Sequence, residues 1–288
     1  MRSPRALPAA LLLAHAGVVA ACGAGPSDED VRRSQAEFDL GVGLVQEQNV
    51  AGAFQHLREA IRLDPDNADA HLMLGTMHLF REELEPAERE LNDALRANAA
   101  LGRSGRPALV SEARNSLGVV YLHGRRFDDA VRELTEASGD LMNRTPHLAW
   151  GNLGWAQFEL HDFEAARLSL EQAVQLQPRF CAGLYRLGRV HLAVGQAEVD
   201  RPADAPAPEG GAAVGLESFQ RAEDALTRAL EVDDPACRAL QEAWRWRGET
   251  RVQLGRREES VADFERCVEL DRNTEAGRAC AQALAAAP

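Results

Sequence analysis

A regular spacing of small residues runs through most of this 288-residue sequence. The stretch LGVGLVQEQNVAGAFQHLREAIRLDPDNADA contains Gly41, Ala53, Leu57 and Ala60, and Pro65 follows them. The same set returns 34 residues later, at Gly75, Ala87, Leu91 and Ala94. It recurs in two more units, at Gly118, Ala130, Leu134 and Ala137, and at Gly154, Ala166, Leu170, Ala173 and Pro178. Self-similarity at this period predicts a stack of repeated structural units.

The spacing of Gly, Ala and Ala resembles the tetratricopeptide repeat, a pair of antiparallel helices. Small residues are needed where the two helices approach closely, and the proline ends the second helix. One helix pair cannot bury its apolar face alone, so several pairs must stack into a solenoid. We therefore expect an all-α solenoid of about six helix pairs with a C-terminal capping helix.

The later units are less regular. The fifth contains Gly188 and is interrupted by DRPADAPAPEGGAAVG, which is rich in Pro, Gly and Ala and is expected to be a flexible loop. The sixth contains Gly248, with Ser260 in place of the usual Ala. The expected boundaries are a signal peptide (1–21), a tether (22–33), repeats one and two (34–101), an insert (102–110), repeats three and four (111–180), repeat five (181–236) with its loop at about 199–215, repeat six (237–274) and a capping helix (275–288).

The N-terminus has the composition of an export signal: two arginines, an apolar stretch and then small residues. Val19, Ala20, Ala21 and Cys22 resemble a bacterial lipobox, which implies a covalent lipid on the Cys22 thiol after cleavage. Two or more acyl chains anchor a protein stably. The alternative is an ordinary cleavage site with a cysteine nearby. Because Gly23 follows instead of an aspartate, we expect a periplasm-facing lipoprotein in the outer membrane of a Gram-negative bacterium.

The charge of the chain excludes some partners. Removal of residues 1–21 takes away two of 32 basic residues and none of 45 acidic ones, which leaves a formal charge of −15. A surface this acidic argues against nucleic acid, which needs a cationic footprint. Apart from the lipid, we expect no cofactor and no small-molecule substrate.

In this repeat the first helix of each pair lines the concave surface. The sixth unit places Glu242, Arg245 and Glu249 there, whereas the first five units place mainly apolar side chains. An apolar strip of this length usually marks a partner site, although such residues can also pack under neighbouring helices or under the long loop. The predicted groove residues are Phe38, Val42, Val45, Leu72, Leu79, Phe80, Val119, Leu122, Leu148, Trp155, Phe158, Tyr185 and Leu192.

The groove does not match the clamps that hold acidic chaperone tails. Those clamps present lysines and asparagines, whereas this chain has no lysine and Asn115 stands almost alone. An extended or helical apolar segment is the expected ligand.

Four cysteines follow the lipobox, and an exported chain meets an oxidising compartment. Cys267 lies on the second helix of repeat six and Cys280 on the helix expected to pack against it, which favours their pairing. Cys181 and Cys237 would then join the starts of consecutive first helices. Four buried thiols are the alternative.

No catalytic constellation is present in the sequence. The histidines are scattered without paired metal-ligand spacing, and there is neither a glycine-rich phosphate loop nor a serine nucleophile elbow. We expect neither an enzyme nor a metal site.

A tetratricopeptide-repeat lipoprotein of this size resembles the pilotins of type IV pilus systems, the PilF, PilW and Tgl group. The stretch NRTPHLAWGNLGWAQFELHDFEAARLSLEQAVQLQPRFCAGLYRLG is similar to the corresponding part of that family, whereas the long loop in repeat five departs from it. The resemblance implies a chaperone-like protein that binds secretin subunits and promotes their multimerisation in the outer membrane. The alternatives are a periplasmic scaffold for cell-wall enzymes and a subunit of outer-membrane protein insertion machinery.

Overall fold

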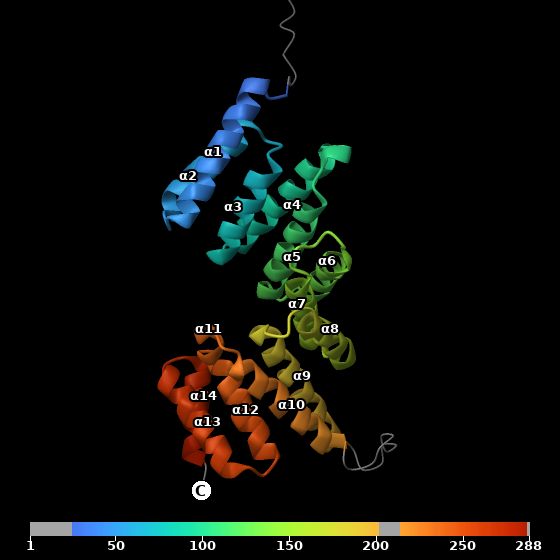
Figure 1. Cartoon of the computed structure of the whole chain (residues 1–288), viewed down its shortest axis with the longest axis vertical. Helices are drawn as coiled ribbons and strands as arrows, with labels where there is room; N and C mark the ends of the chain where they lie inside the picture. The colour runs from blue at the N-terminus through green and yellow to red at the C-terminus, as the bar shows by residue number, and fades with distance from the viewer. Residues whose placement is uncertain (1–24, 202–213, 287–288) are drawn as a thin grey trace, which may run out of the picture.

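The computed structural model describes residues 25–201 and 214–286, and the regular structure in these two ranges is entirely helical (Figure 1). The expected order of six helix pairs and a capping helix is confirmed. The pairs are α1 (Asp28–Gln46) with α2 (Val50–Leu63), α3 (Ala68–Phe80) with α4 (Leu84–Ala100), α5 (Pro107–His123) with α6 (Phe127–Gly139), α7 (Pro146–Glu159) with α8 (Phe163–Leu176), α9 (Cys181–Val199) with α10 (Val214–Glu231), and α12 (Gln241–Gln253) with α13 (Arg257–Leu270).

The repeated glycine sets the distance between the two helices of each pair. In α3, a Cβ added at Gly75 would lie 2.8 Å from the Leu91 side chain of α4. In α9, a Cβ at Gly188 would lie 2.5 Å from the Leu226 side chain of α10. The leucine at this position is fully buried in each case. The glycine is therefore required by close packing against a large core residue of the second helix.

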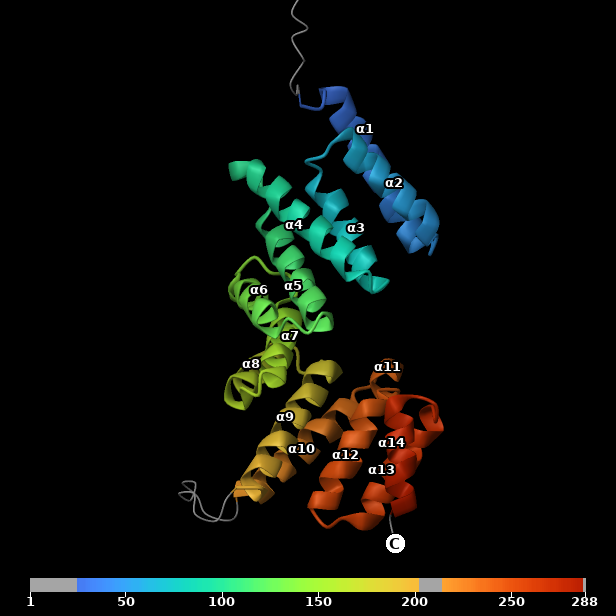
Figure 2. The same cartoon turned by 180° about the vertical axis from the view of Figure 1, so that it is seen from behind.

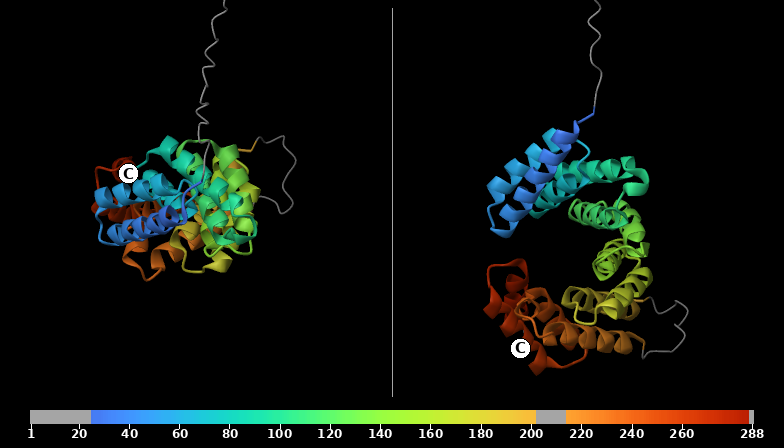
Figure 3. Two further views of the ribbon diagram at one scale, coloured as in Figure 1. Left: turned by 90° about the horizontal axis from the view of Figure 1, so that it is seen from above. Right: turned by 45° about the horizontal axis from the view of Figure 1, so that its top comes forward.

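Successive first helices lie close to one another along the stack. α3 contacts α5, α5 contacts α7, α7 contacts α9 and α9 contacts α12, whereas successive second helices within the described ranges reach no comparable contact. The stack therefore curves with its first helices on the inside, and Figure 3 shows its two ends on the same side of the molecule. We name the surface formed by the solvent-facing sides of α1, α3, α5, α7, α9 and α12 the inner curve.

The first helix pair is less tightly joined to the stack than the other pairs. The contact of α3 with this pair is made mainly through α2, and the views from both sides show α1 diverging from α3 (Figures 1 and 2). This divergence widens the inner curve at its N-terminal end.

Two expected boundaries are corrected, and the ends of the helices that flank the loop in repeat five agree with its expected place at about 199–215. The sequence predicts a tether up to residue 33, but α1 begins at Asp28 because Ser27 and Asp30 form a reciprocal capping box. The sequence also predicts an insert up to residue 110, but a 3₁₀ turn, η1 (Gly102–Ser104), is followed by α5 with Pro107 at its first position, where proline favours a helix start. In repeat five, α9 continues to Val199 and α10 resumes at Val214.

Most of the loop expected at about 199–215 lies outside the described residues, as do residues 1–21 and Cys22.

The C-terminal end of the stack is covered as expected. Helix α14 (Glu275–Ala286) places Ala276 and Cys280 against Phe264 and Cys267 of α13. A short helix, α11 (Pro235–Arg238), precedes α12 and has no counterpart in the sequence prediction. Within the two described ranges, no helix has the length and apolar composition needed to span a membrane.

Candidate partner-binding groove

A cavity of about 540 Å³ lies at the N-terminal end of the inner curve, where α1 diverges from α3. Its wall is formed by α1, α3 and α5, by the segment before α5 and by the loop before α7. Most of the lining side chains are apolar, and an apolar hollow open to solvent is typical of a partner site. The lining residues are Phe38, Asp69, Leu72, Met73, Thr76, Gly105, Arg106, Pro107, Ala108, Leu109, Glu112, Met142 and Arg144.

Charged groups flank this apolar wall. Arg106 forms an ion pair with Asp69, which joins α3 to the segment before α5. Glu112 and Arg144 line the same cavity. An apolar wall with a charged edge is suited to apolar side chains of a partner and leaves polar groups to fix their orientation.

The predicted groove residues of the first three repeats differ in how far their side chains are exposed to solvent. Phe80 ends α3 and is 92% exposed, and Val45 is also exposed. Phe38 and Leu72 line the cavity. Val42 and Val119 are half-buried, and Leu79 and Leu122 pack at the edge of the core cluster around Leu91 and Leu117. Of these residues, Leu72 is 8% exposed and belongs to the core cluster, whereas Phe80 and Val45 are open to solvent.

Two predicted groove residues of repeat five are part of the core. Leu192 is only 2% exposed and packs against Phe219 and Ala222 of α10, so its assignment to the groove is wrong. Tyr185 is half-buried beside the cluster of Leu226 and Ala243, and burial raises the pKa of its hydroxyl. Leu192 packs on α10 of its own repeat, and Tyr185 packs where α10 meets α12 of repeat six.

On the inner curve of repeats four to six, three arginines lie beside two tryptophans. The Arg189 guanidinium carbon lies 5.3 Å from the Trp155 ring centroid, 4.1 Å from that of Trp246 and 5.1 Å from that of Phe158. Arg186 lies 5.7 Å from Trp155, and Arg245 lies 4.4 Å from Trp246. Phe158 stacks on Trp155 at 4.9 Å, and Leu148 is exposed at the start of the same helix. We name Arg186, Trp155, Arg189, Trp246 and Arg245 the arginine–tryptophan stack.

Asn115 belongs to a chain of hydrogen bonds along the first helices, which corrects the expectation that it stands almost alone. The Asn152 side-chain amide donates to Asn115 Oδ1 at 3.1 Å. Arg186 donates to Asn152 Oδ1 at 2.9 Å and to the Gly151 carbonyl at 3.0 Å. The contacts join α5, α7 and α9. Asn152 and Arg186 lie two residues before Gly154 and Gly188, whereas Asn115 lies three residues before Gly118, so the repeat register alone does not align all three.

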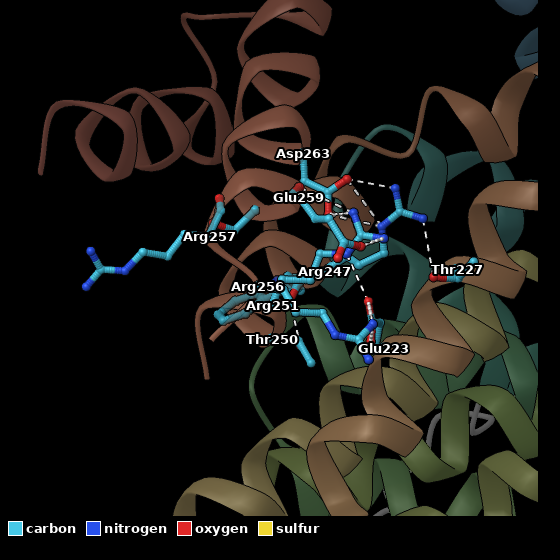
Figure 4. Close-up of polar contacts among 11 residues, drawn as sticks. Glu223, Thr227, Arg247, Thr250, Arg251, Arg256, Arg257, Glu259 and Asp263 are labelled. Carbon is cyan, nitrogen blue, oxygen red and sulfur yellow. Dashed lines mark hydrogen bonds and ion pairs between the residues drawn. The ribbon is translucent and has the colours of Figure 1, made fainter. Parts of the chain in front are cut away.

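Beneath the stack, a network of buried ion pairs joins α10, α12 and α13 (Figure 4). Asp263 is 1% exposed and accepts hydrogen bonds from Arg247 at 2.7 Å and from Arg251 at 2.8 Å. Glu223 accepts from Arg251 at 3.0 Å and from Arg256 at 2.8 Å. Each buried carboxylate therefore has two cationic partners, whose attraction offsets part of the cost of burying it.

Two disulfides lie in the same half of the molecule. Cys267 pairs with Cys280 and fixes the capping helix to α13. Cys181 pairs with Cys237, which lies in α11 and not at the start of a first helix as expected. These are the pairings that the sequence favours.

The N-terminal repeats contain histidine–glutamate pairs. His56 contacts Glu37 at 2.6 Å, and His78 contacts Glu83 at 2.6 Å. Buried His71 contacts Glu90 at 2.7 Å through Nδ1 and the Pro65 carbonyl at 3.0 Å through Nε2. Since a carbonyl and a carboxylate only accept hydrogen bonds, both ring nitrogens of His71 must donate.

The environment of His71 favours its charged form. Burial alone would lower its pKa, but the hydrogen bonds to Glu90 and to Pro65 outweigh burial and raise the pKa above the ordinary value of 6.5. His71, Glu90 and Asp93 also lie close enough together to hold a cation. However, both ring nitrogens of His71 are engaged and Asp93 pairs with Arg96, so the cluster fits an imidazolium better than a metal ion.

A larger hollow of about 850 Å³ lies on the outer side, between α8, α9 and α10. Its walls include charges of both signs, among them Glu171, Arg221 and Asp224. The residues that line it include no aromatic side chain except His191, and we therefore place the candidate groove on the inner curve.

Sequence profiles described as tetratricopeptide repeat match residues 44–101, 147–180 and 241–274. The chain is 28% identical over 165 residues to the type IV pilus assembly protein PilF of Pseudomonas aeruginosa. That match covers 56% of this chain and 61% of PilF, so the chain spans less than two thirds of the relative's length.

Solved structures have the same fold. The structure of PilF from Pseudomonas aeruginosa superposes with a TM-score of 0.60 at 17% identity, over 87% of this chain and 97% of PilF. The structure of PilW, described as a widely conserved type IV pilus biogenesis factor, gives a TM-score of 0.65 at 16% identity, over 85% of this chain and 96% of PilW. The chain is thus an all-α tetratricopeptide-repeat solenoid.

Proposed function

We propose that the chain is a lipid-anchored type IV pilus biogenesis protein that binds secretin subunits and promotes their multimerisation in the outer membrane. The apolar N-terminal part of the inner curve carries the proposal. A cavity of about 540 Å³ lies in the same three repeats as Phe80, which is 92% exposed. Apolar surface left in water is unfavourable, so such a surface favours a partner that covers it.

The relatives support the choice of partner. The sequence match is to a type IV pilus assembly protein, and a second protein of the same fold is a type IV pilus biogenesis factor. A lipid on Cys22 would hold the N-terminal repeats near the membrane, because α1 begins only a few residues later, at Asp28. The widened end of the inner curve would then lie on the membrane side, where a secretin subunit must be received.

In the proposed binding mode, a hydrophobic segment of a secretin monomer places its side chains in the cavity beside Leu72 and Met73 and on Phe80. The protein shields that segment until the subunits assemble. Its chemistry is that of a non-catalytic binding protein: it lowers the free energy of an aggregation-prone monomer without changing a covalent bond.

The test introduces charged side chains at exposed positions of the inner curve, where a substitution does not disturb the core. Phe80→Glu acts on an almost fully exposed side chain, and Thr76→Arg directs a long cation into the cavity from an exposed position of α3. Leu168→Glu is the matched control, because Leu168 is an exposed leucine on the second helix α8. Cells that lack the protein are complemented with each variant, and detergent-resistant secretin multimers are quantified in outer membranes.

We expect few or no multimers with Phe80→Glu and Thr76→Arg, and normal multimers with Leu168→Glu, at equal protein abundance and equal helicity. Normal multimers with both inner-curve variants would contradict the proposed binding surface. The scaffold alternative would be favoured if an inner-curve variant supports normal secretin assembly but no longer co-purifies with a cell-wall enzyme that binds the wild type.

A further inference from the structure

The arginine–tryptophan stack holds guanidinium groups beside aromatic rings. A guanidinium that lies over an aromatic ring has its faces covered, which leaves the N–H groups at its edge for hydrogen bonds. The Arg189 guanidinium carbon lies over the rings of Trp155, Phe158 and Trp246. A guanidinium edge held in a fixed plane is a preorganised donor for a carboxylate, which it can bind through two parallel hydrogen bonds.

The central cations of the stack have no counter-ion within the described ranges. Among the ion pairs of residues 25–201 and 214–286, none includes Arg186 or Arg189. Arg186 donates to Asn152 and to a backbone carbonyl, which are neutral, and Arg245 is the one member that pairs with a carboxylate there, Glu249 at 3.1 Å. The Trp246 indole N–H is buried and has no hydrogen-bond partner within the described chain.

These unpaired cations contrast with the network directly below them. Arg247 follows Trp246 in α12, and its guanidinium binds Asp263 with three hydrogen bonds to the carboxylate oxygens (Figure 4). The chain has 45 acidic and 32 basic residues, so a carboxylate partner for an arginine is easily supplied. In the part of the chain that the structure describes, half-buried Arg186 and Arg189 therefore have no carboxylate partner.

We propose that the arginine–tryptophan stack binds an acidic side chain of the segment that occupies the inner curve. This inference rests on the proposed function and adds a specificity to it. The partner segment carries apolar side chains for the cavity of repeats one to three and an aspartate or glutamate for Arg186 and Arg189 of repeat five.

The two parts of the inner curve favour one continuous polypeptide as the ligand. Successive first helices contact one another from α3 to α12, so a chain that leaves the apolar cavity follows them to the stack. The hydrogen-bonded row of Asn115, Asn152 and Arg186 lies along the same path and offers polar groups to its backbone. The net charge of the protein is −13, so its surface away from the stack repels an acidic side chain. The stack therefore also determines where along the inner curve the acidic residue of the partner segment binds.

A display library of random peptides about twelve residues long tests the inference, because it offers acidic, basic and apolar segments to the protein without bias. Selections are carried out on immobilised wild-type protein, on Arg189→Gln and on Arg221→Gln, an arginine of the outer side that pairs with Glu217. Selected peptides are then synthesised with each Asp or Glu and with the corresponding Asn or Gln, and their affinities are measured by fluorescence anisotropy.

We expect peptides selected on wild type and on Arg221→Gln to be enriched in acidic residues, and those selected on Arg189→Gln not to be. The amide versions should bind wild type about tenfold more weakly, because a charge-assisted bidentate pair is lost, whereas Arg189→Gln should bind both versions alike. Arg189→Lys should lose most of the discrimination, since an ammonium ion lacks the planar fork. Added NaCl should reduce the difference.

The inference is overturned if wild type selects no acidic residues, if the amide peptides bind wild type as tightly as the acidic ones, or if inorganic phosphate displaces peptide equally from wild type and from Arg189→Gln. The secretin multimer assay with Phe80→Glu is independent of this outcome. If wild type shows no acidic selectivity while Phe80→Glu abolishes secretin assembly, only the role of the stack is refuted. If wild type shows acidic selectivity but Phe80→Glu leaves secretin assembly normal, only the secretin partner is refuted.

Discussion

The two halves of the inner curve share one repeat architecture and differ in almost every side chain that faces the concave side. Repeats one to three place Phe38 and exposed Phe80 there, with buried Leu72 in the cavity wall, and His56, His71 and His78 pair with glutamates. Repeats four to six present the arginine–tryptophan stack above a buried ion network, and both disulfides lie there. A close contact of the repeat glycine with a large core residue is found in both halves, with leucine in the first five pairs and with Phe264 in the sixth.

The repeat fixes how the helices pair in both halves, whereas the side chains on the inner curve give the two halves different properties. In a solenoid each repeat contacts only its neighbours, so one end can be made rigid without stiffening the other. Cross-links and buried ion pairs hold the C-terminal half in one shape, which preorganises a polar site. The N-terminal half, in which α1 diverges from α3, can adapt to an apolar partner.

The largest expected effect comes from the buried network. In Asp263→Ala, Arg247 and Arg251 lose their shared carboxylate, and breaking a buried pair in this way costs about 3–5 kcal/mol. Hydrogen-exchange mass spectrometry should show lost protection in α12, α13 and α14 and unchanged protection in α1 to α4. Asp224→Ala, which removes an exposed carboxylate 3.6 Å from Arg228, should change little. Equal loss of protection in both halves would contradict the claim that the buried network stabilises only the C-terminal half.

The disulfides should have the next largest effect. Removal of either bridge by paired Cys→Ala substitution should destabilise the C-terminal half by about 2–4 kcal/mol in urea unfolding. Cys181–Cys237 spans 56 residues and Cys267–Cys280 spans 13, so loss of the longer bridge should cost about 1 kcal/mol more. A larger effect of the shorter bridge would mean that fixing α14 matters more than chain entropy.

The smallest effect concerns the pH response of the N-terminal half. Because the pKa of His71 is raised in the folded state, its contribution to stability is complete below pH 6.5 and is lost as the pH rises through the folded value. Hydrogen exchange in α3 and α4 should therefore accelerate from about pH 6 to about pH 9 after correction for the intrinsic rate. His71→Gln should abolish this dependence, whereas α12 and α13 should show none in either protein. A pH response confined to the C-terminal half would contradict the assignment of the pH dependence to His71.

Much of the fold could be predicted from the sequence because its cause is local and repeated. Gly75, Gly118 and Gly188 each mark a close helix contact, and the spacing of leucine and alanine around them defines the pairs. The disulfide partners follow from the same register. The start of α1 is also readable, because Ser27 and Asp30 have the spacing of a capping box, but the repeat pattern places the boundary too late.

The arginine–tryptophan stack could not be predicted in the same way. Arg189, Trp246 and Trp155 come from three repeats, and only the curvature of the solenoid brings them together. The wrong assignment of Leu192 has a related reason: it sits at a groove position of the repeat, but the extended α9–α10 pair covers it with Phe219. Register predicts which helix face a residue occupies, whereas the neighbouring repeat decides whether that face is open.

Site-specific photo-crosslinking in cells tests the central claim most directly. A photoreactive phenylalanine analogue at Thr76 lies in the apolar cavity of the inner curve, and the same analogue at Leu168 lies on the outer helix α8. The account predicts a secretin adduct from position 76 and none from position 168, with the adduct at position 76 lost when Phe80→Glu is added. Secretin adducts from position 168 with none from position 76 would contradict it.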